Sequence, residues 1–96
     1  MSGAFARPFI LYGRPGCHLC HAAALALQEA GLSFTPPSGG GAWVREESVE
    51  GRPELEAVFG WDIPVLISPE GAVLLKGVFS PERVKKALRM TIAFRD

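Results

Sequence analysis

Two cysteines three residues apart, Cys17 and Cys20, lie between two segments of different character. They follow an apolar run, residues 9–12, whose length and flanking turn-forming residues are typical of a buried strand. They precede an alanine-rich segment, residues 22–30, and alanine has the highest helix propensity of all residues. The sequence therefore predicts that the cysteine pair lies where a strand ends and a helix begins.

The length and composition of the chain indicate a single globular domain over residues 1–96. Ninety-six residues accommodate one hydrophobic core, and 48% of them are hydrophobic while 21% are charged. The 10 basic and 10 acidic residues give a formal net charge of zero, and no basic block provides the footprint of nucleic-acid binding. The basic cluster within residues 83–89 is instead typical of a solvated helix face near its C-terminal end.

No segment of the sequence indicates membrane insertion or export. The longest apolar run is far shorter than the ~20 residues that span a bilayer, and the N-terminal residues lack the long apolar stretch of a signal peptide. Two cysteines at this spacing in a reducing compartment indicate redox or metal chemistry instead of a structural disulfide. We therefore expect a monomeric cytoplasmic protein with no membrane and no nucleic-acid partner.

Turn-forming and capping residues divide the chain into elements in the order βαβαββα. Gly31 is expected to end the first helix in the left-handed conformation, Pro53 and Pro81 suit the first positions of the later helices, and Ser80 is expected to cap the last one. The expected strands are 8–12, 43–49, 63–67 and 73–76, and the expected helices are 53–59, 81–92 and a first helix that begins at residue 17 or 18 and ends at 30. A turn at 68–71, a flexible loop at 35–41 and a loose lead-in at 1–7 complete the chain.

The spacing of apolar residues predicts which face of each helix packs on the sheet. The inward residues are expected to be Ala23, Ala24 and Leu27 in the first helix, Leu55, Val58 and Phe59 in the second, and Val84, Ala87, Leu88, Thr91 and Ile92 in the third. This pattern predicts a single hydrophobic core between the helices and the sheet.

The position of the cysteines predicts a reactive thiol at Cys17. The first N–H groups of a helix lack intrahelical partners and the helix dipole favours negative charge there, so a thiolate is stabilised. We expect the pKa of Cys17 to lie below the ~8.5 of a free cysteine, between about 3.5 and 7.5. Residues three apart on a helix share a face, so a small adjustment joins Cys17 to Cys20. Such a short ring stabilises a fold by only about 2 kcal/mol, which favours a reversible pair in which Cys17 attacks and Cys20 resolves.

Two histidines accompany the cysteines and leave alternatives open. His18 either stabilises the thiolate as an imidazolium or is a solvent-facing helix residue, and His21 is either a proton carrier or an exposed first-turn residue. Cys17, His18, Cys20 and His21 are also four potential zinc ligands, although adjacent Cys–His pairs have difficulty closing one tetrahedron. A metal or iron–sulfur site would therefore be shared by two chains through their Cys17 thiolates.

The cysteine motif and two downstream segments together resemble the glutaredoxin-like branch of the thioredoxin superfamily. The resemblance covers residues 11–20 (LYGRPGCHLC), 53–60 (PELEAVFG) and 63–66 (IPVL), as in small bacterial glutaredoxin-like proteins with a Cys-His-Leu-Cys site. It implies an α/β thioredoxin-like fold with a four-stranded mixed sheet of order 2-1-3-4 and helices on both faces. It also implies a cis bond between Ile63 and Pro64 beside the cysteines, and an Ile63 backbone that binds an extended substrate. Arg14 would bind a glutathione carboxylate or stabilise the thiolate.

The same resemblance implies a thiol–disulfide oxidoreductase without a built-in cofactor, acting on protein or small-molecule disulfides. Electrons would come from glutathione as a co-substrate or from a thioredoxin-type dithiol. Glutaredoxins usually carry a Gly-Gly pair and an acidic residue after the fourth strand, whereas residues 76–82 contain one glycine. In this segment Ser80 offers a hydroxyl and helix-start N–H groups to a carboxylate, and Phe79 either crowds the groove or presents an apolar surface to a protein.

We therefore expect weak use of glutathione, with a protein dithiol as the better partner. The alternative from a different class is a non-catalytic redox or protein-binding module that retains the fold.

Overall fold

The secondary structure follows the order predicted from the sequence. The computed structural model describes residues 7–91, so most of the expected lead-in and Ile92 lie outside the described residues. The strands are β1 (Phe9–Gly13), β2 (Val44–Ser48), β3 (Val65–Ile67) and β4 (Val73–Lys76), and the helices are α1 (His18–Glu29), α2 (Pro53–Phe59) and α3 (Pro81–Arg89). The expected loop at 35–41 contains neither helix nor strand. The βαβαββα order is confirmed.

The four strands form one mixed sheet in the order β2-β1-β3-β4, as the resemblance implied. β1 pairs with β2 in parallel, with Gly13 opposite Ser48 at the end that leads to the cysteines. β3 runs antiparallel to both β1 and β4. The turn between β3 and β4 lies where it was predicted and is closed by a bond of 2.9 Å from the Gly71 N–H to the Ser68 carbonyl.

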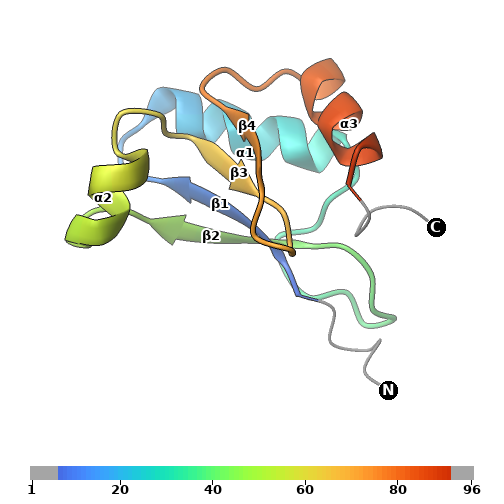
Figure 1. The fold of residues 1–96 in the computed structure, drawn as a ribbon. Helices are drawn as coiled ribbons and strands as arrows, with labels where there is room; N and C mark the ends of the chain where they lie inside the picture. Colours follow the sequence, from blue (N-terminus) through green and yellow to red (C-terminus); the bar gives the residue numbers. More distant parts are fainter. Residues whose placement is uncertain (1–6, 92–96) are drawn as a thin grey trace.

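One face of the sheet carries the hydrophobic core. Alternate residues of β1, Phe9 and Leu11, belong to this core and are buried, and α1 and α3 cover the same face (Figure 1). The buried helix residues are Ala23, Ala26 and Leu27 of α1 and Val84 and Leu88 of α3. Burying one large aliphatic side chain stabilises a fold by about 1.5–3 kcal/mol. This packing therefore fixes the start of α1 relative to the end of β1.

The opposite face of the sheet is covered by α2 at one end (Figure 1). Tyr12 of β1 stacks on Phe59 of α2, with ring centroids 5.2 Å apart. Helices therefore lie on both faces, as implied. The prediction that Val58 packs inward is wrong, because this residue is 64% exposed and no residue of α2 is buried. A helix of 7 residues at the end of a sheet presents only a narrow face to it.

The ends of the two longer helices match the capping residues predicted for them. Gly31 follows α1 with a φ of +99°, a left-handed conformation that favours glycine. The Ser80 hydroxyl caps α3 by accepting the Arg83 N–H at 3.1 Å. The inward face of α1 differs in one residue, since Ala26 is buried and Ala24 is half-buried. None of the helices within residues 7–91 is long and apolar enough to cross a membrane.

Candidate active site

Strand β1 leads to the cysteines through a tight turn. The carbonyl of Gly13, the last residue of β1, accepts the Val49 N–H at 2.9 Å. Gly16 in the following turn has a φ of +78°, in the left-handed region that glycine adopts without strain. Cys17 then takes an extended conformation, with φ −87° and ψ 113°, as the N-cap of α1. The Cys17 side chain therefore faces the first turn of the helix.

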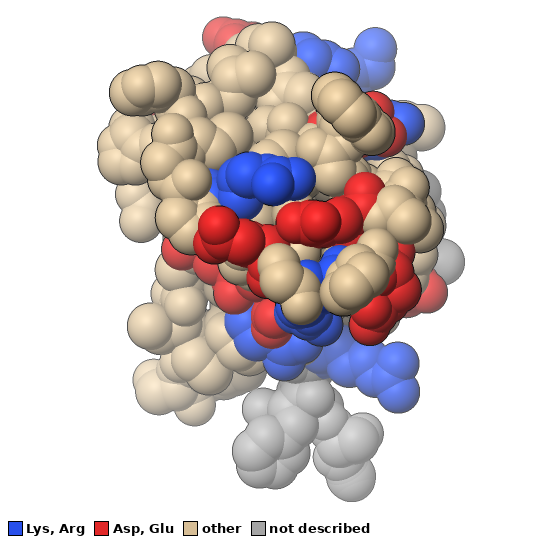
Figure 2. Space-filling model, turned by 90° about the vertical axis from the view of Figure 1, so that its left-hand side faces the viewer, with Lys and Arg blue, Asp and Glu red and all other residues tan. Residues whose placement is uncertain are grey.

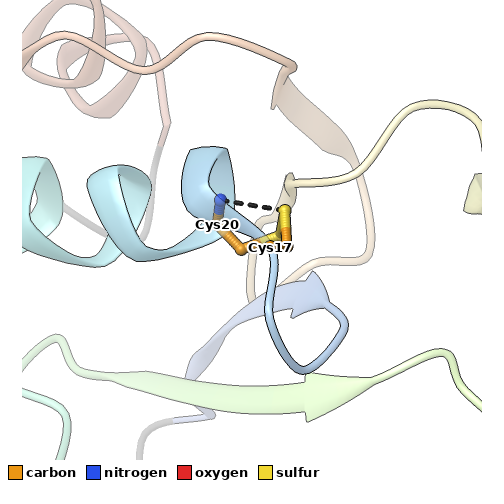
Figure 3. Close-up of a disulfide and its surroundings, with 2 residues drawn as sticks. All are labelled: Cys17 and Cys20. Atoms are coloured by element: carbon orange, nitrogen blue, oxygen red, sulfur yellow. Dashed lines mark hydrogen bonds between the residues drawn. A yellow bond between two sulfur atoms is a disulfide. The ribbon is translucent and has the colours of Figure 1, made fainter.

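Cys17 caps the helix with its sulfur atom. Its Sγ accepts a hydrogen bond from the Cys20 N–H at 3.1 Å (Figure 3), in the place that a serine or aspartate oxygen takes at most capped helices. The two cysteines are joined as a disulfide, with Cα atoms 5.2 Å apart. The first N–H groups of a helix lack intrahelical partners and give its start a partial positive charge, and Cys17 Sγ lies at this end of α1.

Two surface cavities flank the cysteine pair on the side of β2. The larger has a volume of about 380 Å³ and is lined by Arg14, Gly16, Cys17, His18, Cys20, His21 and Glu46. The smaller has a volume of about 330 Å³ and is lined by Leu11, Gly13, Arg14, Pro15, Cys20, Glu46, Glu47 and Ser48. Both cysteines are half-buried. They therefore face space that admits part of another molecule.

Arg14 lies between the cysteines and α2. It lines both cavities, and its guanidinium pairs with the Glu56 carboxylate at an N–O distance of 3.7 Å. The two side chains are 37% and 41% exposed, so solvent screening limits this ion pair to less than about 1 kcal/mol. The structure thus brings Arg14 to the cysteines, where a carboxylate of α2 already neutralises part of its charge.

Carboxylates dominate the end of the molecule that carries α2. Six of the 10 acidic residues fall within residues 46–62, a segment with one basic residue, Arg52. Figure 2 shows Asp and Glu side chains gathered in a band at this end, with Lys and Arg above and below it. Glu47 pairs with Arg45 at 2.7 Å and with Arg52 at 3.0 Å, whereas Glu46 lines both cavities. A molecule in the cavities therefore meets negative charge as well as Arg14.

The segment between α2 and β3 also passes beside the start of α1 (Figures 1 and 3). Its Ile63-Pro64 bond is cis, as the resemblance implied. Pro64 is buried, and its carbonyl accepts the Gly77 N–H at 2.9 Å. Within residues 7–91, neither the N–H nor the carbonyl of Ile63 has a backbone partner. Ile63 and Pro64 are not among the residues that line the two cavities.

The segment after β4 differs from both expectations for it. Phe79 is 6% exposed and belongs to the core, so it neither crowds a groove nor presents an apolar surface. The Val78 carbonyl accepts a hydrogen bond from the Arg83 guanidinium. The Ser80 hydroxyl caps α3. Both polar groups are therefore engaged within the protein.

His18 and His21 are exposed and line the larger cavity together with Cys17. Both histidines therefore border the same space as Cys17. Among residues 7–91, no group of three or more His, Cys, Asp and Glu side chains is arranged to hold a metal ion.

Sequence reasoning missed two residues that adjoin the cysteines, Gly13 and Glu46. Glu46 lies opposite Leu11 in the parallel pairing of β1 with β2, and Gly13 is packed against Cys20. The register of two strands 30 or more residues apart is not indicated by local spacing. The sequence indicated that Gly13 follows a strand, but it did not indicate that Gly13 packs against Cys20.

A mixed sheet of this order with a Cys-x-x-Cys pair at the start of α1 defines a glutaredoxin-like protein of thioredoxin-like fold. Residues 9–89 match the family model of the glutaredoxin-like domain (DUF836), and the chain belongs to this family.

Two solved structures of the protein XcR50 from X. campestris, both structural-genomics targets, have a similar fold. The X-ray structure is 29% identical with a TM-score of 0.68, and the match covers 86% of this chain and 97% of that one. The solution structure is 28% identical with a TM-score of 0.68, covering 88% and 96%. No curated protein matches the chain.

Proposed function

We propose that the protein is a thiol–disulfide oxidoreductase in which Cys17 attacks and Cys20 resolves. The observation that carries this proposal is the Cys17 Sγ at the N-cap of α1, where it accepts the Cys20 N–H and faces an open cavity. Membership of the glutaredoxin-like family supports the same chemistry.

The reaction transfers two electrons to a substrate disulfide in two exchanges. The Cys17 thiolate attacks one substrate sulfur, the substrate S–S bond breaks, and the released thiolate takes a proton from solvent. Cys20 then loses its proton and attacks the Cys17 Sγ, which releases the second substrate sulfur as a thiolate and leaves the Cys17–Cys20 disulfide. A thiol reductant reverses both exchanges and returns the protein to the dithiol.

Three further residues have roles in this proposal. The Ile63 backbone, without a backbone partner within residues 7–91, pairs with an extended substrate as a short strand addition. Pro64 holds that segment beside the disulfide. Charged His18 adds to the stabilisation of the Cys17 thiolate from across the shared cavity.

A protein dithiol is proposed as a better reductant than glutathione. Glutathione carries two carboxylates, and both cavities beside the cysteines present Glu46 together with an Arg14 that is paired with Glu56. Like charges brought together disfavour binding. The Ser80 hydroxyl and the Val78 carbonyl, which could bind the rest of glutathione, are engaged within the protein.

Trapping tests the proposed reaction. Cys20→Ser leaves the mixed disulfide on Cys17 unresolved, so we expect a covalent complex with a disulfide-containing substrate, released by dithiothreitol and identified by mass spectrometry. The matched control is Cys17→Ser, which retains one cysteine of the pair and is expected to trap nothing. Equal trapping by both variants would contradict the assignment of Cys17, and no exchange by the wild-type protein would favour a non-catalytic module.

The choice of reductant has its own experiment. The oxidised protein is reduced by glutathione and, separately, by a thioredoxin system at matched driving force, and we expect the thioredoxin system to be faster. Fast, saturable reduction by glutathione alone that is lost in Arg14→Ala would show instead a glutathione-dependent enzyme. Lys76→Ala is the matched control, because it also removes a partly exposed cation that pairs with a carboxylate, that of Asp62. Unlike Arg14, Lys76 does not line the two cavities.

A further inference from the structure

The end of β1 leaves room for the sulfur of Cys20. A Cβ placed on Gly13 would lie 2.8 Å from Cys20 Sγ and 3.2 Å from Cys20 Cβ. Non-bonded heavy atoms pack at about 3.5–4 Å, so a methyl group at Gly13 and this sulfur exclude one another. Among residues 7–91 other than Gly13 and its two chain neighbours, Cys20 alone has atoms within 4 Å of such a Cβ.

The backbone of Gly13 does not itself require glycine. Its φ is outside the positive region occupied by Gly16 and other glycines of the chain. It lies in β1 opposite Ser48, and the strand conformation accepts any L residue. A side chain at Gly13 is therefore opposed by packing against Cys20 and not by backbone strain.

The contact with the sulfur depends on the redox state of the pair. In the disulfide, Cys20 Sγ is bonded to Cys17 Sγ and stays at the place that a methyl on Gly13 would need. In the dithiol, the bond to Cys17 Sγ is absent, so rotation about χ1 can take the sulfur to another staggered position. The contact with Cys20 Cβ exists in both the disulfide and the dithiol, so it does not change the difference in free energy between them.

We propose that Gly13 is a positioning residue that sets the redox equilibrium of the Cys17–Cys20 pair. Because Gly13 lacks a side chain, the Cys20 sulfur fits against β1 and the disulfide is stabilised relative to the dithiol. This inference rests on the proposed role of the pair as a redox couple. In the reaction with a glutathione buffer, the protein disulfide gains two electrons and two protons, and two glutathione molecules form one glutathione disulfide. Gly13 changes the relative free energies of the two protein states and takes no part in the exchange.

The test measures that equilibrium in Gly13→Ala. The protein is equilibrated in buffers of reduced and oxidised glutathione, and the dithiol fraction is read by alkylation and mass spectrometry. We expect the equilibrium to shift about tenfold toward the dithiol, which corresponds to about 30 mV, in the range expected for one extra methyl in a packed site. The equilibrium is defined whether or not the protein is a catalyst, so failure of the proposed function leaves this measurement intact.

Gly39→Ala is the matched control. The same methyl at Gly39 meets no atom within 4 Å, and Gly39 also lacks a positive φ. We expect its equilibrium to match the wild type. An unchanged equilibrium in folded Gly13→Ala, or a shift toward the disulfide, overturns the proposal, as does an equal shift in Gly39→Ala.

A second variant decides the case in which Gly13→Ala does not fold. The double variant Gly13→Ala/Cys20→Ala lacks the sulfur that the methyl would meet, so we expect it to fold, as judged by circular dichroism and urea unfolding. If the double variant is also unfolded, the obstacle at Gly13 is not the sulfur and the proposal is overturned. If Gly13→Ala folds, its urea midpoint should fall more in the oxidised than in the reduced protein, and the opposite order also overturns the proposal.

Discussion

Helices α1 and α3 begin with the same hydrogen bond made by different atoms. At α1 the Cys17 sulfur accepts the Cys20 N–H, and at α3 the Ser80 hydroxyl accepts the Arg83 N–H, each at 3.1 Å. In both helices the capping residue is extended and the bond reaches three residues ahead. The comparison shows that the cysteine proposed as the nucleophile and an ordinary structural cap share one geometry.

The charges around the two caps differ. α3 has Glu82 in its first turn and Lys86 and Arg89 in its last turn, so its own side chains complement the helix dipole. α1 has no acidic residue in its first turn and no basic residue in its last turn. In the proposed dithiol, the Cys17 thiolate is therefore the anion that interacts with the positive end of the α1 dipole, since no side chain of the first turn is acidic. We therefore expect the proposed reactivity to depend on the atom at the cap and on the absence of a competing acid.

The largest expected effect comes from giving α1 the cap of α3. Cys17→Ser keeps a good capping side chain, so we expect the protein to fold, with a loss of about 2 kcal/mol from the absent disulfide. Exchange should fall to the rate measured without protein, because a serine hydroxyl does not attack disulfides. Reduction of a peptide–glutathione mixed disulfide measures this loss, and circular dichroism checks the fold. If Cys17→Ser retained exchange, the sulfur at the α1 cap would not be the nucleophile, and the two caps would not differ in reactivity.

Removing the cap of α3 should affect stability alone. Ser80→Ala leaves the Arg83 N–H without its partner, and we expect the free energy of unfolding to fall by about 1 kcal/mol, within the range 0.5–2. Urea unfolding of the oxidised protein measures this change. The exchange rate of the folded variant should equal that of the wild type. A loss of exchange without a loss of stability would show that α3 contributes to the site.

The sequence predicted those features that depend on local chemistry. The place of the cysteines between a strand and a helix, the left-handed Gly31 and the Ser80 cap all follow from residue types and short spacings. The sheet order and the cis Ile63-Pro64 bond came from the family resemblance, because pairing between distant strands has no local signature.

The features that the sequence did not predict depend on how distant segments meet. Val58 follows the helical spacing of an inward residue, yet α2 lies at the end of the sheet and leaves it exposed. Phe79 was expected either to crowd the groove or to present an apolar surface to a protein, whereas it packs in the core. The pairing of Arg14 with Glu56 and the contact of Gly13 with Cys20 are likewise consequences of the assembled fold.

The acid in the first turn of α3 offers a smaller test of the dipole argument. Glu82→Gln removes a charge that favours the N-terminal end of the helix, and we expect the free energy of unfolding to fall by about 0.3–1 kcal/mol at low salt. The difference from the wild type should shrink in high salt, since the charge is on the surface. Urea unfolding at two salt concentrations measures it, with Glu50→Gln outside the helices as the control. If the loss of unfolding free energy in Glu82→Gln did not depend on salt, the interaction of Glu82 with the helix dipole would not explain it.

The reciprocal change places an acid in the first turn of α1. Leu19→Glu puts a carboxylate in the same turn as the Cys17 cap, where it also interacts favourably with the helix dipole. In the reduced protein the carboxylate and the Cys17 thiolate repel each other. The midpoint of the pH profile for Cys17 alkylation should therefore rise, by about 0.2–0.7 pH unit if the interaction is about 0.3–1 kcal/mol. Cys20→Ser supplies the background with a single thiol.

The matched control for this change lies on the same helix. Leu19 and Leu25 are both 48% exposed, so Leu25→Glu introduces the same charge with the same loss of apolar contact. It lies eight residues from Cys17, which corresponds to about 12 Å along the helix and exceeds the Debye length of about 8 Å at physiological salt. We therefore expect Leu25→Glu to leave the alkylation midpoint unchanged. If both variants raise the midpoint equally, the start of α1 has no special role and its contrast with α3 reduces to the identity of the capping atom.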